Sequence, residues 1–194
     1  LEIIYPVMDI ILKKYPDVQF HLIRCYPKTM QDLKKRYPEQ VIFTEMGCRI
    51  QEWPQKYAEW DFDIGLAPLW LNKFNEGKSN LKWLENSARK IPTVATDICV
   101  YQEIENGITG YKCKDTKDWV SVLSELIESP GKREQIGQNA YDKVKALYNA
   151  KDNASRYLEA YQDVIKRRKE NANAIRNDDR NEEKSKQIAV ECTR

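Results

Sequence analysis

The chain has 194 residues, enough for one medium-sized domain with extensions. Its 32 basic and 30 acidic residues almost cancel, which argues against a general attraction to nucleic acid or to an anionic membrane. The sequence contains no apolar run near the roughly 20 residues that a membrane-spanning helix needs. We therefore expect a globular protein without a nucleic-acid partner, in which membrane association, if it occurs, is not encoded by these residues.

Apolar runs with strand and helix spacing alternate along the first two thirds of the chain. The patterns predict strands at 18–25, 40–44, 63–67, 92–96 and 111–113, and helices at 6–15, 29–37, 51–59, 79–89 and 116–129. Residues 70–77 have no regular period and are predicted to form a loop. Asp115 is placed to cap the last of these helices. Such alternation predicts an α/β fold, a Rossmann-like parallel sheet with helices on both faces.

The last third of the chain has a different composition. After Pro130-Gly131 two helices are predicted, at 132–148 and 151–169. Beyond Lys169 aromatic residues disappear and charged and amide residues dominate, so that little apolar surface can offset the chain entropy. We thus predict a sheet domain at 1–129, C-terminal helices packed on it at 130–168, and a disordered or frayed tail at 169–194.

The cysteines and the one DxD string do not suggest a metal site. The five cysteines are scattered and form no CxxC, and Cys25, Cys99 and Cys113 lie in apolar stretches typical of core thiols. This usage indicates a reducing, cytoplasmic compartment. Asp61-Phe62-Asp63 has the DxD form that binds a divalent metal in some enzymes, but Asp63 opens a predicted strand and is expected to be structural. We expect no metal and no cofactor.

The loop after the third predicted strand carries the candidate chemistry. It leaves the carboxyl end of that strand, where ligands bind in doubly wound sheets, and runs into a helix N-terminus that favours anions. Gly77 permits close approach of a ligand, Lys78 adds a positive charge and Ser79 a hydroxyl. Glu85, further along the helix, could accept hydrogen bonds from two sugar hydroxyls. The alternative is that Lys78 and Glu85 are surface residues of an amphipathic helix.

The segment from Asp63 to Gly110 resembles the donor-binding half of family 4 GT-B glycosyltransferases (glycosyl transferases group 1). The resemblance rests on the following stretches: Asp63-Ile64-Gly65-Leu66-Ala67-Pro68, then Phe74-Asn75, Lys78-Ser79, Lys82-Trp83-Leu84-Glu85, then Lys90-Ile91-Pro92-Thr93-Val94-Ala95, and Glu103-Ile104-Glu105-Asn106-Gly107-Ile108-Thr109-Gly110. The version around Phe74 to Glu85 is similar to that of bacterial enzymes that build surface polysaccharides. A weaker resemblance extends over residues 1–165.

The resemblance implies roles for individual residues. Glu85 would bind the ribose of a nucleotide sugar, and Gly77, Lys78, Ser79 and Asn80 would hold its diphosphate. The base would lie near Met46 to Ile50, where Arg49 is either a contact or an exposed loop charge. The family's other glutamate falls on Gly77, so Glu76, one residue earlier, is the candidate catalytic residue.

The resemblance also implies the overall function. The chain would be the donor half of a retaining glycosyltransferase in glycan or surface polysaccharide synthesis, cytoplasmic, with peripheral attachment at the inner membrane face left open. The family's first strand and acceptor-binding domain have no counterpart in these residues, so an acceptor glycan or lipid-linked glycan would bind through the missing domain. Without that domain we expect the chain to be inactive. Two alternatives stay open: a non-catalytic nucleotide-sugar- or partner-binding module of a two-chain enzyme, and an inactive remnant.

Overall fold

The computed structural model describes residues 2–191 except 25, 46, 48 and 50, and describes only the backbone of residue 2 and of residues 173–191. The chain divides into two compact units, Leu1–Ala146 and Leu147–Arg194. The first unit contains both sheets and most of the helices, and the second contains the long C-terminal helix. Each unit is described by itself below.

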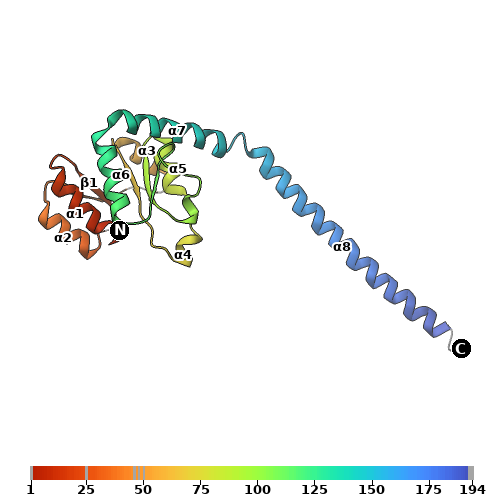
Figure 1. The fold of residues 1–194 in the computed structure, drawn as a ribbon. Coiled ribbons are helices and arrows are strands. Elements are labelled where there is room, and N and C mark those ends of the chain that lie inside the picture. The colour runs from red at the N-terminus through yellow and green to blue at the C-terminus, as the bar shows by residue number, and fades with distance from the viewer. Residues whose placement is uncertain (1, 25, 46, 48, 50, 192–194) are drawn as a thin grey trace. The chain divides into compact units, whose positions relative to one another are not determined.

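The first unit alternates strands and helices as expected (Figure 1). The strands are β1 (Phe20–Ile23), β2 (Val41–Thr44), β3 (Gly65–Ala67), β4 (Thr93–Thr96) and β5 (Tyr111–Cys113). The helices are α1 (Tyr5–Lys14), α2 (Lys28–Arg36), α3 (Trp53–Glu59), α4 (Lys73–Glu76), α5 (Leu81–Ala88), α6 (Thr116–Glu128) and α7 (Pro130–Tyr148). Two short 3₁₀ helices, η1 (Glu2–Ile4) and η2 (Cys99–Tyr101), complete it.

All described strand pairs are parallel, which confirms the predicted fold class. β1 pairs with β2, with Phe20 opposite Val41. β4 lies between β3 and β5, with Gly65 opposite Thr93 and Val94 opposite Tyr111. The described strands form two sheets, of two and three strands, where the sequence predicts one. β4 is buried along its whole length, as expected for the centre of a parallel sheet covered by helices.

The main core lies between α1, α6 and the strands. Val7, Ile11 and Leu12 of α1 share one buried cluster with Trp119 and Leu126 of α6. The cluster also includes apolar side chains from β1, β2, β4 and β5: Phe20, Leu22, Val41, Val94 and Cys113. The helical spacing of the α6 residues therefore marks a core-facing stripe, as the sequence predicts. Asp115 caps α6 as expected, since its Oδ1 accepts from the Asp118 backbone N–H at 2.9 Å.

The predicted loop at 70–77 contains a short helix. α4 begins where the Asn72 side chain accepts a hydrogen bond from the Asn75 backbone N–H at 2.9 Å. The buried Asn75 side chain in turn donates to the Trp70 carbonyl at 2.8 Å. These two amides organise a segment with no apolar period, so the prediction of an irregular loop there was wrong. The helix after it starts at Leu81 with Asn80 as its N-cap residue.

The second unit is the helix α8 (Ala154–Glu191). Its side chains from residue 154 to residue 172 are all exposed, and they include ion pairs within the helix such as Arg167–Asp163 at 2.8 Å. The helix continues past residue 169, where the sequence predicts a disordered or frayed tail; the predicted division at 129 and 168 and the frayed end stay predictions. Over the described part of the chain, none of the helices combines the length and the apolar character required to cross a bilayer.

Candidate functional site

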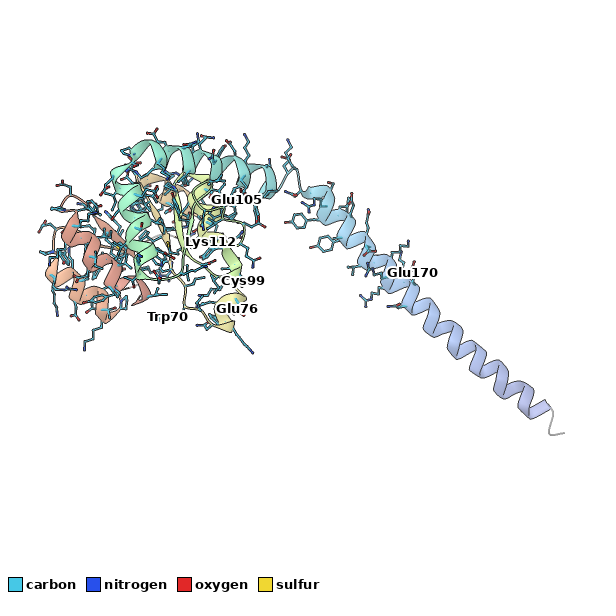
Figure 2. The ribbon with its side chains drawn as sticks, viewed as in Figure 1. Trp70, Glu76, Cys99, Glu105, Lys112 and Glu170 are labelled. Atoms are coloured by element: carbon cyan, nitrogen blue, oxygen red, sulfur yellow. The ribbon has the colours of Figure 1, made fainter. Side chains whose placement is uncertain are left out.

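The candidate site lies where β3 and β4 end. Because the two strands are parallel and adjacent, the loop after Ala67 and the segment after Thr96 leave the same edge of the sheet. The Leu69 backbone N–H donates to Thr96 Oγ1 at 2.9 Å and ties the two together. Further out, the Cys99 thiol of η2 donates to the carbonyl of Glu76, the last residue of α4, across 3.7 Å, and Figure 2 shows the two residues next to each other. This edge brings the 68–80 loop against η2.

Cys99 corrects one expectation. Its apolar neighbours predict a core thiol, but the side chain is exposed because η2 turns it away from the core. Cys113, at the end of β5, is buried as expected, and burial raises the pKa of its thiol to about 12. Cys25 lies outside the described residues. A thiol at the sheet edge thus accompanies Glu76, which no pattern in the sequence indicated.

The predicted phosphate-binding residues are exposed on the 68–80 loop. Glu76, Gly77, Lys78 and Ser79 are exposed and Asn80 is half-buried, directly before α5. The Lys78 ammonium lies 5.2 Å from the ring centroid of Phe74, which is 79% exposed. Gly77, Lys78, Ser79 and Asn80 thus directly precede α5, at a helix N-terminus where backbone N–H groups and a lysine favour an anion, while Glu76 is the last residue of α4.

The backbone conformation and packing at residue 77 do not require a glycine. The φ of Gly77 is −84°, and a Cβ added there would meet only the Phe74 carbonyl oxygen, at 3.6 Å, an ordinary contact. The space in front of it is open to an incoming group.

Glu85 is fixed between two donors. Its side chain is 19% exposed, its Oε1 accepts from the Trp53 indole N–H at 2.9 Å, and its Oε2 accepts from the Lys82 ammonium at 2.9 Å. Lys82 also lies 5.5 Å from the centroid of the Trp53 ring. The sequence indicates Glu85 as a site residue, whereas Trp53 shows only a helical spacing with Tyr57 and Trp60, which indicates packing. The helical spacing of Trp53, Tyr57 and Trp60 was the available signal, and it does not reveal a partner 32 residues away.

Beneath Glu85, α5 is joined to the sheet by a buried polar chain that we call the α5 wall, made of Tyr57, Gly65, Asn86 and Thr93. The Tyr57 hydroxyl donates to Asn86 Oδ1, and Asn86 Nδ2 donates to Thr93 Oγ1 at 3.0 Å. The Asn86 amide rests on Gly65, where an added Cβ would come within 2.1 Å of it. Burial raises the pKa of Tyr57 to about 12, the nearby Glu85 charge adds to the rise, and Arg89 opposes it. The Tyr57 hydroxyl therefore stays protonated and can donate its hydrogen bond throughout the ordinary pH range.

Arg49 lies on the loop before α3. Its side chain is exposed, and its backbone N–H donates to Glu52 Oε2 at 2.9 Å. Glu52 directly precedes Trp53, so the loop adjoins the residue that holds Glu85. Met46, Cys48 and Ile50 of the predicted base-binding loop lie outside the described residues. A base contact by Arg49 stays a prediction.

Asp63 of the DxD string and the single histidine, His21, have structural partners. Asp63 forms an ion pair with Arg133 of α7 at 2.9 Å, and Arg133 also donates to the Leu126 carbonyl at 2.7 Å. His21 contacts Gln19 at 3.2 Å and the Phe62 ring edge-on at 5.3 Å. Among the described residues, no three His, Cys, Asp or Glu side chains are grouped so that they could hold a metal ion.

Comparison with known proteins gives matches among solved structures only. No protein-family model and no curated protein matches the chain. The C-terminal domain of a glycosyl transferase group 1 family protein (LpcC) from Francisella tularensis superposes with a TM-score of 0.61 at 25% identity, over 75% of this chain and 77% of that one. The fold at the sheet edge is thus one that a glycosyltransferase domain uses. The chain has the fold of a GT-B C-terminal domain.

Two further structures with this fold were solved with ligands. S. aureus TarM, as a mutant in complex with fondaparinux, alpha-GlcNAc-glycerol and UDP, has a TM-score of 0.65 at 18% identity over 81% of this chain. Anabaena Alr3699/HepE, in complex with UDP and glucose, has a TM-score of 0.62 at 16% identity over 81% of this chain. At these identities the likeness concerns the fold. The GT-B C-terminal fold spans 32% of the TarM chain and 44% of the HepE chain.

Proposed function

We propose that the chain binds a nucleotide-diphospho-sugar donor for a retaining glycosyltransferase that acts in glycan or surface polysaccharide synthesis. The observation that carries the proposal is the carboxylate of Glu85, held in one place on α5 beside an exposed loop that presents Lys78 at the helix N-terminus. A carboxylate that can accept from hydroxyl groups, next to a lysine and the N-terminus of a helix, suits a ribose followed by a diphosphate.

Each site residue has a role in this proposal. Glu85 accepts hydrogen bonds from the vicinal ribose hydroxyls. Lys78 and the N–H groups at the start of α5 neutralise the diphosphate, and they stabilise the negative charge that it gains as it leaves the sugar. Ser79 and Asn80 add polar donors, and Gly77 leaves room for the phosphates.

The sugar would lie toward Glu76. This carboxylate is exposed at the end of α4, where its backbone is attached to η2 by the Cys99 contact. We assign it the contact with the donor sugar. Arg49 is assigned to the base, at the end of the site where Trp53 meets Glu85.

Transfer of the sugar itself needs a second domain, one that binds the acceptor. The proposal places the acceptor glycan on another domain, so the chain alone would bind the donor without transferring its sugar. Binding of UDP to the structural neighbours supports the donor assignment by likeness of fold. The identities of the base, the sugar and the acceptor are determined by experiment.

The test is calorimetric titration of the chain with UDP, GDP, dTDP and their sugar conjugates, repeated with Lys78→Ala and Glu85→Ala. We expect one nucleotide to bind, and either variant to weaken binding by about 1–3 kcal/mol, the worth of a charge-assisted hydrogen bond. Lys13→Ala, which removes an exposed lysine of α1, is the matched control and should bind like the wild type.

Two outcomes would contradict the proposal. Absence of binding by a chain with a cooperative unfolding transition would leave a partner-binding module or an inactive remnant. Binding that survives both substitutions unchanged would place the nucleotide elsewhere on the domain.

A further inference from the structure

Trp53 connects α3 to the carboxylate on α5 through a hydrogen bond, in addition to its packing. Its indole N–H donates to Glu85 Oε1 at 2.9 Å, while the Lys82 ammonium occupies Glu85 Oε2 at the same distance. The two donors come from different elements, α3 and α5, so that the carboxylate is held from two sides. A carboxylate held by two donors cannot rotate without breaking at least one of these bonds.

The indole is itself immobilised. The Trp53 ring stacks on Tyr57 with centroids 5.2 Å apart and planes 22° apart, and Trp60 meets it edge-on at 5.8 Å. Tyr57 in turn donates to Asn86, the residue next to Glu85. Two adjacent residues of α5 are thus held by two residues of α3 one helical turn apart. The orientation of the Trp53 N–H is therefore fixed by the fold.

The number of lone pairs on the Glu85 carboxylate determines how many further hydrogen bonds it can accept. A carboxylate offers about four lone-pair directions, two on each oxygen. The indole takes one on Oε1 and the ammonium takes one on Oε2, which leaves one on each oxygen. Two acceptor directions on one fixed carboxylate match the two hydroxyls of a vicinal diol. The indole is neutral, so it orients the carboxylate without cancelling the charge that makes it a strong acceptor.

We propose that Trp53 is a positioning residue that holds the Glu85 carboxylate in the orientation required to bind the ribose diol. This inference rests on the proposed function, because it assumes that Glu85 accepts from ribose hydroxyls. It adds a residue, a contact and a reason why ribonucleotides in particular should be recognised. The position of Trp53 directly after the loop of Arg49 and Glu52 also joins the proposed base and ribose contacts through one short segment.

The experiment measures how much the ribose diol contributes to binding affinity when the Trp53 indole N–H is present and when it is absent. The nucleoside diphosphate that binds best and its 2′,3′-dideoxy counterpart are titrated into the wild type and into Trp53→Phe, which keeps an aromatic ring on Tyr57 but removes the N–H. We expect the wild type to prefer the ribonucleotide. The variant should lose about tenfold in affinity for the ribonucleotide, as for a weakened bond to a charged group, and little for the dideoxynucleotide.

Trp60→Phe is the matched control, because it makes the same chemical change in a ring of the same aromatic cluster. It should leave the preference for the ribonucleotide unchanged. An equal loss for both nucleotides in Trp53→Phe, or an unchanged preference, would overturn the positioning role while the donor site stands. A wild type that binds neither nucleotide, or binds both equally, would overturn the proposed ribose contact and the inference with it.

A second measurement covers the case in which Trp53→Phe does not fold. The Trp53 indole N–H signal is followed by nuclear magnetic resonance in the wild type and in Glu85→Gln. We expect the signal to move upfield in Glu85→Gln as the charged acceptor is lost, and to respond to the ribonucleotide more than to the dideoxynucleotide. A signal that is the same in both proteins and indifferent to the diol would overturn the inference.

Discussion

The α5 wall and the 68–80 loop meet at the same site but are built in opposite ways. In the wall, Asn86 is buried, hydrogen-bonded on both sides and pressed onto Gly65. In the loop, Lys78 and Phe74 contact each other and are exposed, and Gly77 has open space before it. Packing therefore specifies the α5 wall, whereas packing does not require the exposed Lys78 and Phe74 or a glycine at residue 77.

The largest expected effect breaks the wall. In Gly65→Ala the new Cβ would lie 2.1–2.7 Å from the Asn86 amide, so Asn86 must move and lose its bonds to Tyr57 and Thr93. We expect the free energy of unfolding to fall by about 3 kcal/mol, the upper range for an overpacked core with lost buried hydrogen bonds. Urea denaturation followed by far-ultraviolet circular dichroism measures it.

Gly77→Ala is the control from the loop. Its backbone is already compatible with alanine and a Cβ fits, so stability should stay the same or rise by up to about 1 kcal/mol. If the two glycine substitutions cost the same, the contrast between wall and loop is wrong. A Gly77→Ala chain that is stable but binds the nucleotide more weakly would sharpen it.

The helices and strands of the domain could be predicted from the sequence in outline. β5 was predicted with its observed bounds because the turns at Asn106-Gly107 and Thr109-Gly110 precede a short segment, Tyr111-Lys112-Cys113, with apolar residues at both ends. α6 was predicted because Trp119, Leu123 and Leu126 repeat with helical period. Both signals are local, since they depend on residues within one or two turns of each other.

The contacts that shape the site are not local, and the sequence does not contain them in readable form. Trp53 and Glu85 are 32 residues apart, as are the Tyr57 carbonyl and Arg89, which donates to it at 2.8 Å. Spacing predicts that Trp53 packs, and it does stack on Tyr57, but spacing says nothing of where an N–H finds its acceptor. Only α4 had an overlooked local signal, the N-cap Asn72.

A smaller effect on the free energy of unfolding concerns backbone strain just after α5. Lys90, the second residue after α5, has a φ of 58°, a left-handed conformation that favours glycine, and Gly137 of α7 packs on its carbonyl, where a Cβ would come within 1.8 Å. We expect Lys90→Gly to raise the free energy of unfolding by about 0.5 kcal/mol, as relief of strain outweighs the added chain entropy.

Lys90→Ala separates strain from the side chain. It keeps the left-handed strain and removes the contact of the ammonium with the Tyr141 ring, whose centroid lies 5.3 Å away. Thermal unfolding of the three proteins should place Lys90→Gly above the wild type and Lys90→Ala below it. The reverse order of the two variants would show that the left-handed conformation at residue 90 costs no stability, and that the backbone after α5 is unstrained.

The smallest effect is a pH dependence from His21, which packs edge-on against Phe62 at 5.3 Å. Burial lowers the pKa of His21 below its usual 6.5, so the unfolded chain takes up the proton before the folded chain does as the pH falls. Stability from this group is complete above pH 6.5 and decreases as the pH falls below it, by less than about 1 kcal/mol because the ring is partly exposed. Urea denaturation at about pH 7.5 and about pH 5.5, on either side of the usual pKa, should show a larger decrease for the wild type than for His21→Gln. Equal decreases would mean that the packing of His21 against Phe62 tolerates a charged imidazole.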